Sequence, residues 1–552
     1  MERFKKLVTL GMSIAVLFLF GACGGEKNVE KDDKNEVNTY LGSGIKTLDI
    51  SKATDANASF IFTQVMEGLT RVSVDERGQD IILPGLAESW ETSEDGLVWT
   101  FYLRDSKWWD GSELTAEDFV YSIKRTLDPA TASQYAFILS PIKNAMEYNS
   151  GKAKADDVGV AALDEKTLQF TLKSPTGYFL DLTYYKTLHP QRRDVVEKYG
   201  DRYGATMESL IANGPFVVKE WIPNNKVTLV KNENYWDKDN VRIDQVNVQV
   251  VQDTNAQMNM LLNGQLDIAG VSKQEWVKKF EETGRFNVVK GYTAGSNYTF
   301  FNLDDGIFKN DKIRKAFSLS ITREDMGDVI FKGIFESAYG WVPPKIQIAG
   351  KEFRSEVPEP LKQLKDESPD PRELLAEGLR ELGMDENPEN LRVSYLNTGT
   401  NDWSRTFFEY IQQMWKKTLG VEIEGIFVEW PVFQKMIDEK DYQLAGMAWI
   451  GDYNDPSTFL DIWKSDAGIY NTGFKNDRYD ELIEMAGVEV DQEKRLEYFR
   501  EAENILLYEE SAIAPSLYRK RNTFISKRLG GITIPLFGGM DYKTVYIVED
   551  ED

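Results

Sequence analysis

Residues 86–129 read LAESWETSEDGLVWTFYLRDSKWWDGSELTAEDFVYSIKRTLDP and form the most strongly patterned stretch of the chain. The run VWTFYL, which begins at Val98, predicts a strand because side chains alternate between the two faces of an extended segment. One face carries Trp99, Phe101 and Leu103. Residues 108–111, Trp-Trp-Asp-Gly, follow and predict a turn that closes a hairpin.

A helix is predicted directly after this turn. Thr115 can accept a hydrogen bond from the free N–H groups of a helix start, and Asp118 can bond back to the backbone N–H of Thr115. The apolar stripe of the helix is Phe119, Ile123 and Leu127. The pair Asp128-Pro129 ends the helix, because proline disfavours the helical conformation of the residue before it.

Strands and helices alternate through the rest of the chain. The further strands that we predict are residues 226–230, 243–251, 266–269, 391–396 and 421–427. The further helices are residues 57–69, a segment through 258–262, 403–419 and 492–509. Residues 343–390 are rich in Pro, Glu, Lys and Asp and should form surface loops with one helix near 372–382. With 552 residues, the chain exceeds what one core usually supports, so we expect an α/β protein of several lobes.

The composition excludes several functional classes. The formal net charge of −25 opposes binding to nucleic acid or to anionic lipid, because both need basic patches. Cys23 is the only cysteine and His189 the only histidine, so disulfides, thiolate metal sites and His-rich metal or haem sites are not expected. His189 directly precedes Pro190 and should be a turn residue. Nothing resembles a Walker loop, a dinucleotide fingerprint or a His-Glu-x-x-His motif, and we predict no metal, no cofactor and no catalytic residue.

The N-terminus has the pattern of an export signal. Three basic side chains within residues 3–6 precede an apolar run over residues 7–20, and a Gly-Ala-Cys sequence follows and ends at Cys23. A basic segment, a short apolar run and small residues before the cleavage site predict a signal peptide over residues 1–22. Residues 23–38 would then be a lipidated cysteine and a flexible tether, since few of them are apolar.

A cleavage site that ends on cysteine is the pattern of a bacterial lipobox, in which the thiol of Cys23 receives a diacylglycerol. One departure is Phe20, where leucine is commoner. Two or three acyl chains on one residue give stable membrane anchoring. We therefore expect an exported protein anchored to the cell membrane and facing outside, which is the periplasmic side in a Gram-negative cell. The alternative is an ordinary secretory signal with an incidental cysteine.

Four blocks of sequence occur in a characteristic order along nearly the whole mature chain. They are residues 86–90 with 114–122 and 127–129, residues 213–216 with 232–237, residues 301–303 with 313–321, and residues 449–456. Together these blocks resemble the peptide/nickel class of bacterial extracellular solute-binding proteins, which serve ABC importers.

The resemblance implies the fold of a periplasmic binding protein, an α/β clamshell of two lobes with an additional third domain that closes around a ligand. By analogy, domain I combines residues 39–66, 211–291 and 518–552. Residues 67–210 would form the additional domain II, and residues 292–517 would form domain III.

The resemblance also implies an anchor for the ligand. In oligopeptide-binding members an aspartate of the fourth block holds the α-ammonium group of the peptide, and Asp452 matches it. A buried ammonium group needs a carboxylate and further acceptors to offset its desolvation. The alternative is that Asp452 is only an Asx-turn residue of its loop.

Further peptide contacts follow from the same resemblance. Main-chain groups of Ala448 to Ile450, and those near Asp55 and Ala56, would pair with the peptide backbone like an added strand. The side chains that match ligand contacts are Trp430, Trp449, Tyr135 and Asn397, each of which could instead be an ordinary core or surface residue. Some members carry an arginine where this chain has Gly446, which leaves open how the ligand's carboxylate is held.

These features predict a lipid-anchored extracellular protein that captures oligopeptides and delivers them to the permease subunits of an ABC importer with cytoplasmic ATPases. We expect a monomer that performs no bond chemistry. A receptor for one signalling peptide would use the same site with narrower pockets. The alternative from another class is a secreted carbohydrate-active enzyme, which would need two carboxylates about 5 to 10 Å apart across a sugar groove. No local spacing marks such a pair.

Overall fold

The first described element of the chain is a strand. The computed structural model describes residues 35–331, 334–368, 370–399, 402–467 and 470–548. The predicted signal peptide and Cys23 lie outside the described residues. Strand β1 (Glu36–Leu41) starts before Thr39, so the tether that we predicted as far as residue 38 is too long. The physical reason is that β1 pairs in parallel with a second strand from Glu36 onward and that Val37 is fully buried.

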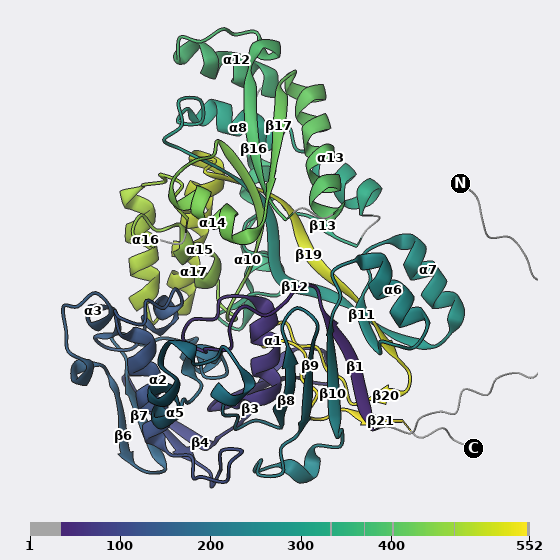
Figure 1. Ribbon diagram of the computed structural model, residues 1–552. Helices are drawn as coiled ribbons and strands as arrows, with labels where there is room; N and C mark the ends of the chain where they lie inside the picture. Colours follow the sequence, from purple (N-terminus) through teal and green to yellow (C-terminus); the bar gives the residue numbers. More distant parts are fainter. Residues whose placement is uncertain (1–34, 332–333, 369, 400–401, 468–469, 549–552) are drawn as a thin grey trace, which may run out of the picture. The chain divides into compact units, whose positions relative to one another are not determined.

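The first four-stranded sheet has the order β1-β10-β9-β8. Its other strands are β8 (Phe216–Ile222), β9 (Lys226–Lys231) and β10 (Gln245–Val250), which pair with one another in antiparallel fashion. Helix α1 (Ala56–Val65) contacts β8 and lies beside this sheet (Figure 1). The predicted strands 226–230 and 243–251 are confirmed. The predicted helix 57–69 is also confirmed, but it ends at Val65, four residues early.

A second four-stranded sheet has the order β4-β5-β7-β6 and is antiparallel. Its strands are β4 (Ala87–Thr92), β5 (Val98–Leu103), β6 (Val160–Asp164) and β7 (Thr167–Thr171). Strand β5 has the predicted bounds, and helix α2 (Ala116–Leu127) contacts β6. The carboxylate of Asp118 accepts a hydrogen bond from the backbone N–H of Thr115 at 2.9 Å, as predicted. The predicted stripe of α2 is buried, which explains why this helix packs on the sheet.

The largest sheet has the order β11-β19-β12-β18-β16-β17, with β13 paired to β19. Its strands are β11 (Ile268–Gly270), β12 (Phe286–Phe301), β13 (Glu336–Ser337), β16 (Arg392–Thr398), β17 (Glu422–Val428), β18 (Leu444–Ile450) and β19 (Ile513–Ser526). Strands β12 and β19 are its longest, with 16 and 14 residues. Parallel strands β16 and β17 are joined by α13 (Asp402–Leu419), which confirms the predicted strand–helix–strand unit.

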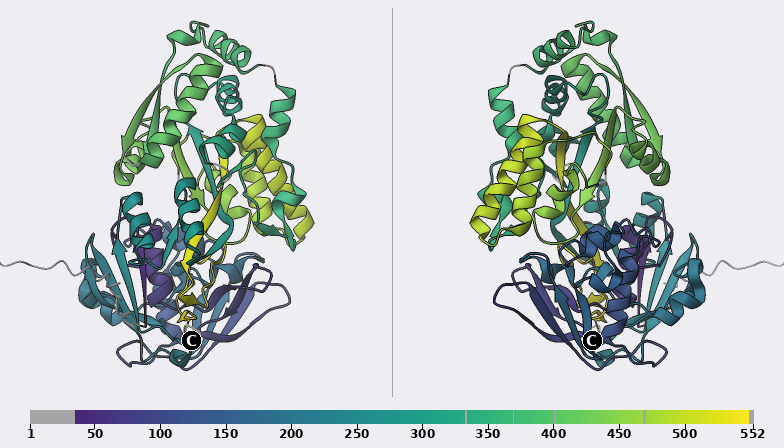
Figure 2. Two further views of the ribbon diagram at one scale, coloured as in Figure 1. Left: turned by 90° about the vertical axis from the view of Figure 1, so that its right-hand side faces the viewer. Right: turned by 90° about the vertical axis from the view of Figure 1, so that its left-hand side faces the viewer.

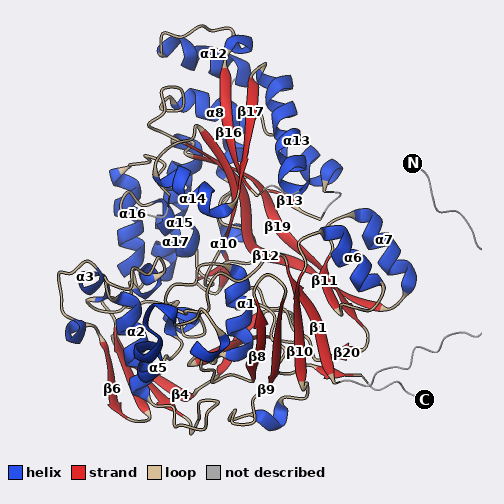
Figure 3. Cartoon of the chain, in the orientation of Figure 1, coloured by secondary structure: helices blue, strands red, loops and turns tan. Residues whose placement is uncertain are grey.

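Helices cover the sheets and connect their strands, as Figure 3 shows. The remaining helices of eight or more residues are α6 (Thr254–Leu262), α7 (Gln274–Thr283), α8 (Asp311–Leu319), α11 (Pro360–Glu367), α12 (Pro371–Glu381), α14 (Trp430–Asp438), α16 (Asp477–Val488) and α17 (Gln492–Asn504). The shorter ones are α3 (Ala145–Asn149), α4 (Phe179–Leu182), α5 (Arg193–Tyr199), α9 (Arg323–Asp325), α10 (Phe353–Glu356) and α15 (Ser457–Leu460). Helices α16 and α17 contact each other along their lengths, and both are yellow-green in Figure 2.

The small strands are β2 (Thr70–Val74), β3 (Asp80–Pro84), β14 (Gln347–Ile348), β15 (Lys351–Glu352), β20 (Leu529–Gly530) and β21 (Tyr546–Ile547). Among the described residues no helix is long and apolar enough to span a membrane.

The charged segment 343–390 holds more helix than we predicted. Helix α12 is the one expected near residues 372–382, but α10 and α11 precede it. Helix α11 begins at Pro360 and buries Leu361 and Leu364. This apolar face is too narrow to stand out from the surrounding Lys, Asp and Glu, so the prediction of loops was wrong here.

Candidate functional site

One edge of strand β18 offers unpaired backbone groups. On one side, β18 pairs with β12 over its whole length, residues 444–450. On the other side it pairs with β16 over residues 444–446 only. The edge of residues 447–450 that faces away from β12 therefore pairs with no other strand of the described chain. Such an edge is a template on which an additional strand can pair.

A cavity of about 910 Å³ lies against this free edge. Its walls come from α1, from residues 133–137 and 184–186, from α14 and from residues 534–539. Of the predicted site residues, the structure brings together Ala56, Tyr135, Trp430, Ala448, Trp449, Ile450 and Asp452. Segments that are far apart in the sequence thus line one cavity of a size typical of ligand sites.

Asp452 lies just beyond the free edge, and its carboxylate is only partly satisfied. Its Oδ1 accepts a hydrogen bond of 2.8 Å from the hydroxyl group of Tyr185. Its Oδ2 is shielded from solvent and has no hydrogen-bond partner among the described residues. Burial raises the pKa of Asp452 to about 6, while the bond from Tyr185 and the charge of Lys186 lower it. The carboxylate is therefore ionised at neutral pH and has an unused acceptor.

The geometry does not support the alternative that Asp452 is an Asx-turn residue. Within the described chain its carboxylate accepts no backbone N–H. The Asx-type contact in this loop belongs to Asp455, whose Oδ1 accepts the backbone N–H of Ser457 at 2.9 Å. The backbone N–H of Asp452 instead donates to the hydroxyl oxygen of Thr458 at 2.9 Å, which fixes the position of the loop.

Tyr185 and Lys186 belong to the site although the sequence did not indicate them. The ring of Tyr185 stacks on that of Tyr135 with centroids 6.1 Å apart. The ammonium group of Lys186 lies 4.5 Å from the Tyr135 ring centroid and 5.2 Å from that of Tyr185, and it donates to the hydroxyl oxygen of Ser59 at 3.0 Å. No motif surrounds these residues, and 266 positions separate Lys186 from Asp452. Only the fold brings them together.

The two predicted tryptophans form apolar walls. Trp449 is held in place because its indole N–H donates to the backbone oxygen of Thr458 at 2.9 Å. Trp430, on α14, stacks on Phe433 with centroids 5.7 Å apart, and it is 39% exposed. An exposed aromatic ring at a cavity is available to pack against a ligand side chain.

Two predicted contact residues lie outside the cavity lining. Asp55 caps helix α1, where its carboxylate accepts the backbone N–H of Ala58 at 2.9 Å. Asn397 is buried in β16, and its side-chain amide donates to the backbone oxygen of Tyr395 at 3.2 Å. Asp55 thus positions the helix whose next residue, Ala56, lines the cavity, and Asn397 contributes to the sheet behind β18.

The absence of an arginine at position 446 has a steric cause. A Cβ atom added to Gly446 would lie 1.9 Å from the hydroxyl oxygen of Tyr395. No side chain fits there unless the buried tyrosine moves. Position 446 therefore carries no side chain, and the ring of Tyr395 occupies the space beside it.

His189 is not the simple turn residue that we predicted. It is 6% exposed and lines the cavity, and its Nε2 lies 3.1 Å from the backbone oxygen of Tyr184. Burial lowers the pKa of His189 to about 4, so the ring is neutral at physiological pH. The described residues contain no group of three or more His, Cys, Asp or Glu residues that could hold a metal ion.

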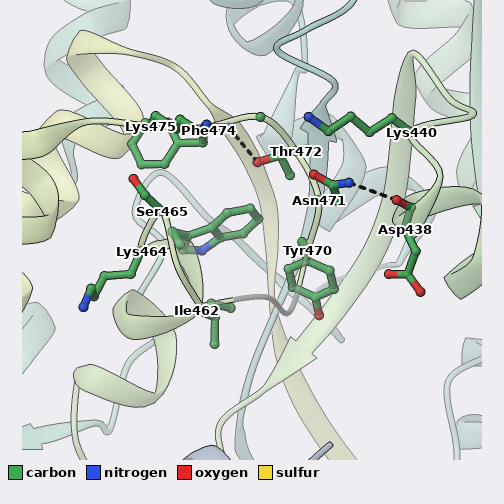
Figure 4. A pocket seen from close by; sticks show the side chains of 12 residues that line it. Asp438, Lys440, Ile462, Lys464, Ser465, Tyr470, Asn471, Thr472, Phe474 and Lys475 are labelled. Carbon is green, nitrogen blue, oxygen red and sulfur yellow. Dashed lines mark hydrogen bonds between the residues drawn. The ribbon is translucent and has the colours of Figure 1, made fainter. Parts of the chain in front are cut away.

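A smaller cavity of about 380 Å³, shown in Figure 4, shares lining residues with the first one. Asp438 and Tyr470 line both cavities. The rest of its lining is mixed: polar side chains include Lys440, Lys464 and Lys475, and apolar ones are Ile462, Trp463 and Phe474. Tyr470 contacts Trp449 at a centroid distance of 6.2 Å, so this tyrosine forms part of the wall between the two spaces.

Comparison with known proteins now identifies the family. Residues 82–471 match the model of the bacterial extracellular solute-binding proteins, family 5 Middle. The chain belongs to this family. The oligopeptide-binding protein OppA of Bacillus subtilis is 33% identical to it, over 99% of this chain and 100% of that protein.

Solved structures of the family share the fold. The substrate-binding domain of an oligopeptide ABC transporter from Bacillus anthracis has a TM-score of 0.83 at 31% identity, over 94% of this chain and 99% of that chain. Listeria monocytogenes OppA bound to peptide has a TM-score of 0.82 at 29% identity, over 94% of this chain and 100% of that chain. The predicted α/β fold of a binding protein is confirmed. The family consists of solute-binding proteins, which counts against a carbohydrate-active enzyme.

Proposed function

We propose that this protein binds oligopeptides outside the cell and delivers them to the permease subunits of an ABC importer. The relatives named above are described as oligopeptide-binding or oligopeptide-transporting, and one was solved with a peptide bound. One observation carries the proposal: the free edge of β18 leads directly to the half-satisfied carboxylate of Asp452.

Asp452 would hold the N-terminal ammonium group of the peptide. Tyr185 already donates to Oδ1, so the ammonium group would donate to Oδ2 and form a second, charge-assisted hydrogen bond. Such bonds are shorter and stronger than neutral ones, and the shielding of Oδ2 from solvent strengthens them further. This anchor would give every bound peptide the same direction.

The peptide backbone would pair with the free edge of β18. From Asp452 the edge runs back through residues 450 to 447, so a strand whose N-terminus lies at Asp452 runs antiparallel to β18. At about 3.4 Å per residue, four edge residues offer about 14 Å, which suits peptides of about three to five residues. Pairing through main-chain groups does not select side chains. This favours uptake of many sequences over reception of one signalling peptide.

We retain the three-domain division as part of the proposal. The β4-β5-β7-β6 sheet falls within residues 67–210, whereas β12 and β19 both cross the proposed boundary to residues 292–517. The pairing of β12 with β19 shifts register between Tyr292 and Ser296, next to this boundary. Irregular pairing bends strands. These two strands would therefore act as the hinge on which the lobes close around the peptide.

Lipid anchoring at Cys23 completes the proposed function. An acylated N-terminus would hold the protein at the outer surface of the membrane, close to the permease, and the following residues would serve as the tether. We propose that the protein acts there as a monomer.

Isothermal titration calorimetry with three forms of Ala-Ala-Ala tests the proposal. The free tripeptide should bind, and N-acetylation should weaken binding by about tenfold or more, because the charged donor is lost. Amidation of the C-terminus is the matched control, since it removes a charge at the other end. If acetylation and amidation had the same effect, Asp452 would not be the ammonium anchor. If no tri-, tetra- or pentapeptide bound, the protein would not be an oligopeptide receptor.

A further inference from the structure

Lys186 is a buried cation inside the cavity that no carboxylate neutralises. Its side chain is 5% exposed, and it lines the cavity together with Ser59, Tyr135 and Tyr185. The hydroxyl oxygen of Ser59 is the single hydrogen-bond acceptor of its ammonium group in the described structure. An ammonium group can donate three hydrogen bonds, so two of its donors are unused.

The other strongly buried cations show what burial ordinarily requires. Among the described residues, Arg314, Arg323 and Arg495 are also at most 4% exposed. The guanidinium group of Arg495 binds both carboxylate oxygens of Asp455, at 2.6 and 2.7 Å. Those of Arg314 and Arg323 are surrounded by several backbone carbonyl oxygens. Lys186 has neither arrangement, although a buried charge without compensation is costly.

The nearest negative charges do not supply the missing partner. Asp452 and Asp55 act on Lys186 electrostatically, but no carboxylate oxygen of the described chain lies within the 4.0 Å of an ion pair. Burial lowers the pKa of Lys186 and these two aspartates raise it. Asp55 is occupied as the cap of α1, and Asp452 faces the proposed ammonium group of the ligand. A carboxylate on the ligand would supply the ion-pair partner that the described residues do not.

The position of Lys186 defines where on the ligand this partner must be. Tyr185 donates its hydroxyl hydrogen to Asp452, and the same tyrosine ring lies beside the ammonium group of Lys186. One tyrosine side chain therefore connects the two charged sites. A ligand group that reaches Lys186 is therefore only a short distance along the ligand chain from the ammonium group at Asp452.

We propose that Lys186 binds a ligand carboxylate located within two residues of the N-terminal ammonium group. This carboxylate is either the side chain of Asp or Glu at position one or two, or the C-terminal carboxylate of a dipeptide. The inference rests on the proposed function and refines it, because it makes the cavity selective for ligands with a paired cation and anion at one end. The two aromatic rings beside Lys186 exclude water and strengthen this interaction.

The test compares matched peptides by isothermal titration calorimetry. Glu-Ala-Ala and Gln-Ala-Ala, Ala-Glu-Ala and Ala-Gln-Ala, and the reference Ala-Ala-Ala are all used as C-terminal amides, so that only side chains differ in charge. A comparison of Ala-Ala as free acid with its C-terminal amide tests whether Lys186 binds the C-terminal carboxylate of a dipeptide. If the carboxylate is a side chain, the wild type should bind the Glu peptide about ten- to a hundredfold more tightly than the matched Gln peptide, at position one or two. If it is the C-terminus of a dipeptide, free Ala-Ala should bind more tightly than its amide by the same factor.

Lys186→Met removes the charge and keeps the length of the side chain. In this variant the Glu/Gln and acid/amide ratios of affinity should fall to about one, because the ligand's carboxylate no longer meets a cation. Lys198→Met is the matched control: Lys198 is an exposed lysine 5.1 Å from the ring of Tyr199, and it does not line the cavity. It should keep the wild-type ratios. Melting temperatures of both variants establish that they are folded.

Ratios near one for all three pairs in the wild type would overturn the inference, whether or not Lys186→Met folds. Wild-type ratios that persist in Lys186→Met would overturn it as well. Binding of the Ala-Ala-Ala amide separates this result from failure of the proposed function. If the reference peptide binds and the ratios are near one, the protein is a peptide receptor and Lys186 is not its carboxylate site. If no peptide binds, both proposals fail.

Discussion

Replacing Asp452 with Asn should remove most of the pH dependence of peptide binding while the shape of the cavity is preserved. Burial raises the pKa of Asp452 to about 6, and the bond from Tyr185 and the charge of Lys186 lower it. The ionised carboxylate is the form that attracts an ammonium group. Affinity is therefore greatest near about pH 7, below the α-amino pKa of about 7.7–8.0 at which the ligand loses its charge, and falls as pH decreases through about 6. The side chain of Asn has the same size and can still accept the hydrogen bond from Tyr185.

The magnitude follows from the fraction of ionised carboxylate. With a pKa of about 6, nearly all Asp452 side chains are ionised at about pH 7.5 and about one in eleven at about pH 5. The apparent Kd of the wild type should thus rise about tenfold between these values, which corresponds to about 1.4 kcal/mol. In Asp452→Asn the charge-assisted bond is lost at every pH, and we expect about ten- to a hundredfold weaker binding at about pH 7.5.

Calorimetry of tripeptide binding at several pH values, in buffers of different ionisation enthalpy, measures the Kd at each pH and the number of protons released on binding. Wild-type protein should release protons on binding near pH 6, since the ligand's ammonium group lowers the pKa of Asp452. The pKa of His189, lowered by burial to about 4, leaves that ring neutral over this range. A wild-type Kd that stays constant between about pH 5 and 7.5, or an Asn variant with the wild-type slope, would refute the reasoning.

Three further predictions concern stability and anchoring. Because folding raises the pKa of Asp452, its ionised form destabilises the unliganded protein above about pH 6, and this penalty disappears below about pH 4. Asp452→Asn should therefore raise the melting temperature at about pH 7.5 but not at about pH 4; an equal shift at both values would contradict this. Gly446→Ala should lower the free energy of unfolding by about 1–3 kcal/mol in a urea titration, because its Cβ would overlap Tyr395. The control Gly291→Ala, whose Cβ meets nothing within 4 Å, should change it little, and equal losses would argue against the overlap. Cys23→Ala should release the protein into the medium or leave its leader uncleaved; a variant that remains on the membrane with its leader removed would disprove lipid anchoring.

Local sequence patterns predicted the elements whose residues carry their own signals. The alternation from Val98 to Leu103 became strand β5, and the pairing of Thr115 with Asp118 became the start of α2. The strand–helix–strand unit of β16, α13 and β17 was predicted for the same reason, since each segment has its own period of apolar residues. Helices α10 and α11 were missed because they are short and half of their residues are charged, and because their stability comes from packing rather than from local pattern.

The candidate site was predicted in part. Resemblance to a family indicated Asp452 and the tryptophans, and the structure places these residues in one cavity. The same resemblance indicated Asn397, which the structure places in the sheet outside the lining. A match at one position says which residue stands there but not which way its side chain points, because the direction depends on strand register.

By itself, the sequence determined the α/β class, strand β5 and helix α2 within residues 86–129, and an N-terminal pattern typical of exported lipoproteins. Each of these depends on neighbours within about ten residues, which sequence displays directly. The hairpin that the sequence placed at residues 108–111 is instead closed by residues 93–97, between β4 and β5. Tertiary structure alone decided that the pairing of β16 with β18 ends at residue 446 and leaves the rest of the β18 edge free. It also decided that Lys186 lies near Asp452 with the hydroxyl group of Ser59 as its single hydrogen-bond acceptor in the described structure. These features arise from contacts between segments hundreds of residues apart, and their energies of pairing and burial have no counterpart in local sequence.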